Sequence, residues 1–496
     1  MSIFYKTVIV GKKGVDVSVK PHLITPDSWL TLTQLHTLRG QIENFPGWKT
    51  ILDSGDVGGF GTLAAEFEDN AGDIAHIFGG PTKVYQYNPT LRTLIERSAD
   101  LTPNVPTRDN PWSWFVYKNA LYLGNRGSGF YKWQGLNIVS IPDAPKARSY
   151  AVLNDHICAL NTVDSVRRFQ WAAEGSETVW TAAADNDAGL FELDNTPGVG
   201  VALVPFDIDL VAYKADSIIT LAFVGGNEVF GVRSELKRIN ILGPEVVVDT
   251  GVVHIIMGQE FFYRYRGGRD LDENFGQAIH DKVYDDLHAT YRNRARSFYI
   301  RGTREAVFAY PSLASSGDCD KCVVYNVDDD AWYGPFAIDV SMFGRTARER
   351  TSLAHPINLF VTSSGDILEI GAAQDNNGST ITRAAETGDQ NIGIEAVDGS
   401  GKAVSFPLGM VYTTNVLNVD FEPTAGTGRV RIGYRMELND PIVYTDYVDF
   451  ALSPAGNVKI PFRTTGRWFR VSFSLPASVD MHLIGYQYEF FPVGRR

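Results

Sequence analysis

The chain has 496 residues and a formal net charge of −13 at pH 7, with many aromatic residues and 47 glycines. This acidic balance argues against broad, tight binding to nucleic acid, because proteins that neutralise many phosphates carry a basic surplus. Three cysteines, Cys158, Cys319 and Cys322, are too few for a disulfide-stapled secreted fold. Without a signal-peptide pattern or an apolar run near about 20 residues, we expect a soluble protein made in a cytoplasm, with no membrane span.

Residues 1–50 show little repeat character, and we expect them to form an N-terminal arm or first strands. Residues 40–52, GQIENFPGWKTIL, favour an extended conformation with a turn at Phe45-Pro46-Gly47. This region would lead into whatever repeats follow.

The clearest repeat unit is residues 112–142, WSWFVYKNALYLGNRGSGFYKWQGLNIVSIP. Four short runs rich in aromatic and β-branched residues alternate with turns that contain Asn and Gly, as in an antiparallel meander. An isolated meander of this size buries too little apolar surface to be stable alone. We therefore expect it to be one blade of a repeated structure.

Related groups of strands begin near residue 57 and continue through 149–171, 210–233, 252–266 and 297–370. Between the last two, Ile279, Val283 and Leu287 recur every four residues and predict a short helix. The spacing between equivalent strands is typical of propeller blades. The sequence therefore predicts an all-β protein whose residues 51–372 form a β-propeller of about six blades.

Beyond a boundary near residues 372–379, longer strands alternate apolar and polar residues, as in VRIGYRM and WFRVSFSL. This period of two is typical of an antiparallel sandwich with one face of each sheet buried. We assign residues 373–496 to a C-terminal β-sandwich domain of about eight strands.

The main basic feature is a run of alternating arginines that begins with Arg292, Arg294 and Arg296 and continues with Arg301 and Arg304. Arginines on one side of a strand suit a phosphate backbone or an acidic neighbouring subunit. They equally suit a solvated edge that discourages edge-to-edge pairing, and both interpretations stay open. Residues 345–350, RTARER, are a weaker version of the same pattern.

Two further motifs fit structural roles better than chemical ones. Asp328, Asp329 and Asp330 supply three carboxylates, but calcium loops alternate oxygen ligands around a fixing glycine, so a solvated turn is favoured. Cys319 and Cys322 have CxxC spacing without a second ligand pair, which favours a surface hairpin with two free thiols over a zinc site. Since no local triad or carboxylate pair stands out, we expect no catalytic residue, metal or cofactor.

Several stretches together resemble one known family. They are QIENFPGWKTIL, RFQWAAEGSETVW, DIDLVAYKADSIITLAFVGGNEVF, the 277–291 stretch QAIHDKVYDDLHATY, and FRTTGRWFRVSFSL, in this order. They resemble the propeller-containing tail nozzle, also called the tail hub or packaged-DNA stabilisation protein, of short-tailed bacteriophages. Arg463, Arg467 and Arg470 fit the basic residues that this family carries around its last Gly-Arg strand.

The resemblance implies a non-enzymatic virion protein, assembled in the host bacterial cytoplasm as a hexameric ring below the portal and the adaptor. Such a ring extends the DNA channel, retains packaged DNA, lets it pass non-specifically at infection, and meets fibres, spikes or a plug. An acidic wall would repel phosphates and let DNA slide. The candidate interface or channel residues are Arg292, Arg294, Arg296, Asp328, Asp329, Asp330, Arg467 and Arg470.

Two alternatives remain open at this point. One is a propeller-type glycan-binding or glycan-hydrolysing protein, which predicts a pocket at the propeller axis with close carboxylates. The other is a scaffold propeller that binds protein partners outside any virus.

Overall fold

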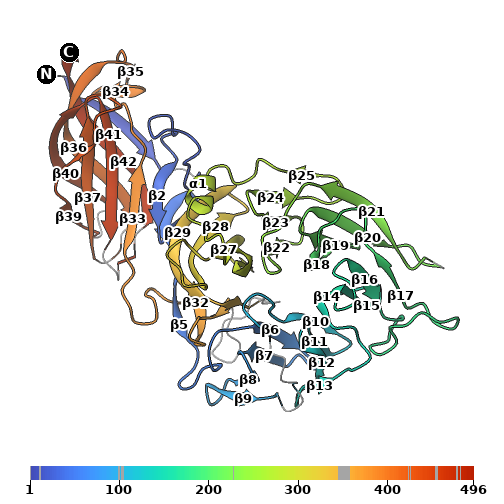
Figure 1. Ribbon diagram of the computed structural model, residues 1–496. Helices are drawn as coiled ribbons and strands as arrows, with labels where there is room; N and C mark the ends of the chain where they lie inside the picture. The colour runs from blue at the N-terminus through green and yellow to red at the C-terminus, as the bar shows by residue number, and fades with distance from the viewer. Residues whose placement is uncertain are drawn as a thin grey trace.

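The computed structural model describes residues 2–10, 13–98, 101, 106–226, 228–344, 358–422, 424, 426–452, 456–475, 479–480 and 482–495. The basic stretch 345–350 lies outside these ranges. The protein is nearly all β, as the sequence predicts, and consists of a propeller and a sandwich (Figure 1). Among the described residues, no helix is long and apolar enough to cross a membrane.

The propeller consists, within the described residues, of seven four-stranded antiparallel sheets, here blades 1 to 7. Blades 1 to 4 are formed by β6 (Leu63–Glu68), β7 (Ile74–Gly79), β8 (Val84–Asn88) and β9 (Thr93–Glu96); β10 (Ser113–Tyr117), β11 (Ala120–Asn125), β12 (Gly129–Trp133) and β13 (Val139–Ser140); β14 (Ala147–Leu153), β15 (His156–Thr162), β16 (Arg168–Trp171) and β17 (Gly189–Glu192); β18 (Gly200–Phe206), β19 (Asp209–Lys214), β20 (Ser217–Phe223) and β21 (Phe230–Lys237). Blades 5 to 7 are formed by β22 (Val247–Asp249), β23 (His254–Met257), β24 (Phe262–Tyr265) and β25 (Leu271–Asp272); β26 (Arg296–Ile300), β27 (Glu305–Tyr310), β28 (Cys319–Asn326) and β29 (Ala331–Val340); β30 (Met342–Phe343), β31 (Leu359–Val361), β32 (Ile367–Ala373) and β5 (Gly47–Thr50).

The ring closes through a strand from the far N-terminal end of the propeller. β5 pairs antiparallel with β32, with Trp48 opposite Ile370, and so completes blade 7. The first strand of blade 7, β30, lies beside the first strands of both blade 6 and blade 1. The count is seven rather than about six because residues 297–370 contain two blades, one of which borrows its outer strand from residues 47–50.

Aromatic stacking between neighbouring blades explains the aromatic-rich repeat. In blade 2, Phe115 stacks on Tyr122 at 5.2 Å between ring centroids. Phe130 then stacks on Tyr150 of blade 3 at 4.8 Å, which joins the two blades. Large aromatic side chains bury much apolar area each, so they fill the wedge between adjacent sheets. The sequence-predicted unit 112–142 is this blade, with all four strands in place.

The predicted helix is shorter than its period suggests. α1 spans His280–Tyr284, followed by the short 3₁₀ turn η1 (Arg292–Arg294). Ile279, Val283 and Leu287 are nevertheless all buried, so the four-residue spacing marks a core-facing side of the segment. The segment thus packs as expected while only its middle is helical.

Two sheets form the sandwich, and both ends of the chain contribute to it. One sheet contains β1 (Phe4–Ile9), β3 (Leu35–Leu38), β4 (Gln41–Asn44), β34 (Ala396–Asp398), β35 (Ala403–Val404), β36 (Met410–Glu422), β40 (Asn457–Gly466) and β42 (His482–Arg495). The other contains β2 (Trp29–Thr33), β33 (Arg383–Thr387), β37 (Thr427–Arg435), β38 (Val443–Tyr444), β39 (Val448–Ala451) and β41 (Trp468–Leu475). The propeller is therefore inserted between strands of the sandwich.

The sandwich contacts the propeller mainly at the outer strand of blade 6, β29 (Figure 1). The Val15 amide donates to the Trp332 carbonyl at 2.7 Å, and the hydroxyls of Thr37 and Tyr333 lie 2.7 Å apart. At the same joint, His36 Nδ1 lies 2.7 Å from Glu305 Oε1, and both side chains are buried. Paired polar groups within an apolar contact fix the orientation of the two domains.

Candidate functional site

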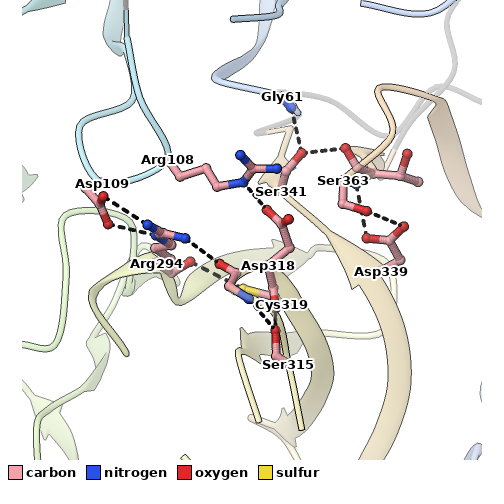
Figure 2. A network of polar contacts seen from close by, with 12 residues as sticks. Gly61, Arg108, Asp109, Arg294, Ser315, Asp318, Cys319, Asp339, Ser341 and Ser363 are labelled. Carbon is pink, nitrogen blue, oxygen red and sulfur yellow. Dashed lines mark hydrogen bonds and ion pairs between the residues drawn. The ribbon is translucent and has the colours of Figure 1, made fainter. Parts of the chain in front are cut away.

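A polar network among the described residues lies on one face of the propeller. The first strand of each blade is its innermost strand, and these strands run in the same direction along the propeller axis. The segments that lead into them therefore lie on one face of the propeller. We call this side the entry face. One of the two longest of these segments joins β9 to β10, residues 97–112, and its described part reaches across to blade 6 (Figure 2).

Two ion pairs hold this crossing segment. Arg108 Nε donates to Asp318 Oδ1 at 2.6 Å, while its guanidinium lies 3.9 Å from the centroid of the Phe60 ring. Asp109 accepts two hydrogen bonds from Arg294, at 2.8 and 3.1 Å. These hydrogen bonds from Arg294 hold the pKa of Asp109 below its usual value. The network therefore keeps both partners charged at neutral pH.

Arg296, the first residue of β26, is buried beneath this network with 2% of its surface exposed. Its guanidinium donates to three backbone carbonyls, those of Ser341 at 3.1 Å, Ala295 at 3.1 Å and Arg108 at 2.6 Å. Burial lowers the pKa of Arg296 from its usual value. Because the three carbonyls belong to three segments, one side chain ties the crossing segment to blades 6 and 7.

The same network continues to the junction of blades 7 and 1. Ser341 Oγ accepts from the Gly61 amide at 2.7 Å and donates to the Thr362 carbonyl at 2.6 Å (Figure 2). A Cβ on Gly61 would lie 2.6 Å from Cβ of Val361, so only glycine permits this approach. These donors and acceptors satisfy one another, and the arrangement fixes the closure of the ring.

Most of the arginines predicted as a row on one strand face are dispersed. Arg292 in η1 donates to Gln259 Oε1 at 3.3 Å, and Arg294 contacts Asp109 and the Tyr291 ring, with 4.5 Å to its centroid. Arg296 points into the interior. The three arginines alternate because Arg292 and Arg294 lie in the η1 turn and Arg296 begins β26. The structure brings Arg294 and Arg296 into one network and places Arg292 beside blade 5.

The three aspartates lie in the tight turn between β28 and β29. Asp328 pairs with Arg304 at 2.7 Å, and Asp330 accepts from the Tyr325 hydroxyl at 2.6 Å. The backbone amides of Asp328 and Asp329 both donate to the side chain of Asn326. Among the described residues, no group of three His, Cys, Asp or Glu side chains could hold a metal ion. The turn is an ordinary hairpin whose carboxylates meet neighbouring side chains.

Arg467 and Arg470 belong to β40–β41 of the sandwich and contact carboxylates of their own chain. Arg470 Nε donates to Asp389 Oδ1 at 2.6 Å, and Arg470 Nη1 to Glu386 Oε1 at 3.2 Å. Burial opposes this charge, but the hydrogen bonds and charge of Asp389 outweigh it and raise the pKa of Arg470. Arg467 pairs with Glu437.

The cysteine prediction was wrong in one respect. Cys319 and Cys322 are free thiols, as expected, but both are buried in β28 rather than exposed on a hairpin. Burial raises the pKa of the Cys319 thiol to about 12, and it also raises the pKa of the Cys322 thiol. The strand lies beneath η1, where Cys319 Sγ contacts the Arg294 carbonyl at 3.3 Å. Buried neutral thiols of this kind are unreactive.

Sequence reasoning missed Arg108 and Asp109, which organise the entry face. They lie in a connection without periodicity, and the signal that was present is length, since β9 ends at Glu96 and β10 begins at Ser113. Long connections between short strands often carry function.

No protein family and no curated protein matches the chain. Among solved structures, the WD40 domain of Neurospora crassa Pan2 is similar, with 8% identity, 71% of this chain and 98% of that chain covered, and a TM-score of 0.39. An exo-beta-1,3-galactanase from Phanerochaete chrysosporium is similar at 9% identity, covering 86% of this chain and 99% of that chain, with a TM-score of 0.24. The assignment as a propeller therefore rests on the blade topology described above.

Proposed function

We propose that the protein is a structural virion component, the tail nozzle of a short-tailed phage, which extends the DNA channel, retains packaged DNA and lets it pass at infection. The observation that carries this proposal is the path of the chain at the joint between its domains. The family-like segment QIENFPGWKTIL runs from β4 of the sandwich directly into β5, which closes the propeller.

The packing at this crossing supports a rigid building block. A Cβ on Gly47 would lie 2.2 Å from the Asp375 carbonyl oxygen, so the FPG turn requires glycine there. Phe45 is buried and packs on Phe336 of blade 6, with ring centroids 5.0 Å apart. The chain crosses between the two domains twice and β29 packs on the sandwich, and this packing supports a rigid subunit in the proposed ring.

The proposed assembly is a hexamer that contacts the adaptor above and fibres, spikes or a plug below. A net charge of −13 suits a channel that DNA passes without adhering, since it repels phosphates. The ring requires a head-to-tail interface that closes after a fixed rotation per subunit.

Negative-stain electron microscopy of the purified protein, with mass photometry of the same sample, tests this proposal. Six-fold rings with a central hole wide enough for duplex DNA are the expected result, either alone or after addition of the adaptor. Monomers that form no ring in either condition contradict it.

A second candidate is glycan binding, which one groove of the sandwich favours. A polar groove of about 290 Å³ crosses β1, β42, β36 and β40. Its lining combines an aromatic ring with amide and hydroxyl groups, and with two charged groups, all of which can hydrogen-bond or stack on sugars: Tyr5, Thr7, Asn418, Asn457 and Gln487, with Asp420 and Lys459. Binding in a broad glycan screen that is lost in Asn457→Ala would support this candidate, and an empty screen would remove it.

A further inference from the structure

Two arginines on the entry face lack an acidic partner among the described residues. Arg126 lies in the turn between β11 and β12, and its Nε donates to the Thr162 carbonyl at 3.3 Å. Arg148 is the second residue of β14, and its buried Nε has no hydrogen-bond partner in the described part of the chain. Both side chains are half-buried, and a buried N–H group is normally hydrogen-bonded, so the Nε of Arg148 is an exception.

The strand register brings the two side chains together. Thr162, which holds Arg126, is paired with Ala147, the residue before Arg148. Because side chains alternate along a strand, Arg148 lies on the same face of β14 as Tyr150. Tyr150 stacks on Phe130 of blade 2. Arg148 therefore faces blade 2, whose β11–β12 turn carries Arg126.

The surrounding charges leave this spot positive. Burial, and then the charges of Arg126 and Arg296, lower the pKa of Arg148, while Asp109 acts in the opposite direction. Asp109, however, already accepts two hydrogen bonds from Arg294 (Figure 2). Like charges at a half-buried site repel one another, and an anion between them would relieve that repulsion.

We propose that Arg126 and Arg148 form a binding site for a phosphate group on the entry face of the propeller. Guanidinium groups present planar pairs of N–H donors that match phosphate oxygens, and their positive charges attract the anion. The group comes either from inorganic phosphate or from a phosphodiester backbone, which share this chemistry. The inference does not rest on the proposed virion role.

Thermal unfolding in increasing inorganic phosphate, at an ionic strength kept constant with chloride, tests the site. The wild-type protein should be stabilised saturably, because a ligand that binds only the native state raises the unfolding temperature. Arg126→Gln and Arg148→Gln should each weaken phosphate binding about tenfold, the effect of losing a charge-assisted hydrogen bond. Arg429→Gln is the matched control, since it removes one positive charge from an exposed pair in the sandwich.

A second measurement separates binding from packing. Without phosphate, Arg148→Gln should unfold at the same temperature as wild type or higher, because it removes a repelled charge. Competition by a short oligonucleotide without terminal phosphates would identify the phosphodiester as the source, and failure to compete would identify free phosphate. Equal stabilisation of all variants by phosphate, or a phosphate-independent loss of stability in Arg148→Gln, would overturn the proposal.

Discussion

The entry face of the propeller holds a buried arginine and the inner strands of the smaller sandwich sheet hold a half-buried one, and their charges are balanced differently. Arg296 donates only to backbone carbonyls, at 2.6 to 3.1 Å. Arg470 meets the carboxylates of Asp389 and Glu386, and Arg435 contacts Asp389 as well. Carbonyl dipoles supply partial charge spread over several segments, whereas a carboxylate supplies full charge at one point. The carbonyl groups around Arg296 join separate blades, whereas the stabilisation of Arg435 and Arg470 depends mainly on the single carboxylate of Asp389.

Replacing Asp389 with Asn should give the largest effect. The Asp389 side chain is fully buried, and its loss would leave Arg435 and Arg470 without their common counter-charge. Breaking a buried ion pair from one side costs about 3–5 kcal/mol. Urea unfolding followed by tryptophan fluorescence should show this loss in the free energy of unfolding. A change below about 1 kcal/mol would contradict the assignment of Asp389 as the shared counter-charge of both arginines.

Replacing Arg296 with Met should have a smaller effect, because three carbonyls lose a donor but no charge is left unpaired. We expect a loss of about 2 kcal/mol in the free energy of unfolding, from hydrogen bonds worth about 1 kcal/mol each offset in part by easier burial. The same urea titration measures it. Exchange of a buried charge for an apolar residue is sometimes stabilising. A gain here would show that the carbonyl cradle serves geometry rather than stability.

The buried pair at the joint between the two regions predicts a pH dependence. Burial lowers the pKa of His36, but the charge and hydrogen bond of Glu305 outweigh it, so the pKa is raised above 6.5. A raised pKa means that the native state holds the proton more tightly, so this stabilisation is complete below about pH 6.5 and is lost as pH rises through the native value. The slope can reach at most about 1.4 kcal/mol per pH unit.

The measurement is the free energy of unfolding of wild type and His36→Gln between pH 5 and 9. The difference between the two should shrink as pH rises. His22→Gln, which removes a half-buried histidine that contacts Trp468 in the sandwich, is the matched control for loss of an imidazole. A wild-type advantage that grows with pH would contradict the assigned direction.

The smallest effect is expected for Glu437→Gln. Glu437 is 62% exposed where it pairs with Arg467, and exposed pairs contribute under about 1 kcal/mol because water and salt screen them. Urea unfolding should barely distinguish this variant from wild type. A loss comparable to that of Asp389→Asn would show that Arg467 depends on this partner far more than its exposure suggests.

Local sequence patterns predicted local structure well. The strands and turns of residues 112–142 follow from aromatic runs and Asn-Gly turns, both of which act over a few residues. The alternating strands of the C-terminal sandwich follow equally from a period of two.

Long-range pairing escaped the sequence. Nothing in GWKT reveals that it joins β32 more than 300 residues later, and this hid the seventh blade. Only part of the candidate site could be predicted from the sequence, because its contacts also join distant parts of the chain. Arg294 and Arg296 stand in a conspicuous row, but their partners Asp109 and Ser341 come from distant connections that carry no periodic signal.

The pairing of β1 with β42 has a consequence for how the chain is made. Phe4 lies opposite Phe490, so β1 is synthesised long before the strand with which it pairs. At synthesis speeds of about 5–20 residues per second, the interval between the two strands is tens of seconds. The blades can assemble in turn during this time. The edge of β1, in contrast, stays unpaired and accessible to chaperones until β42 is synthesised. Translational pausing before β42 should lengthen the time for which this edge is exposed.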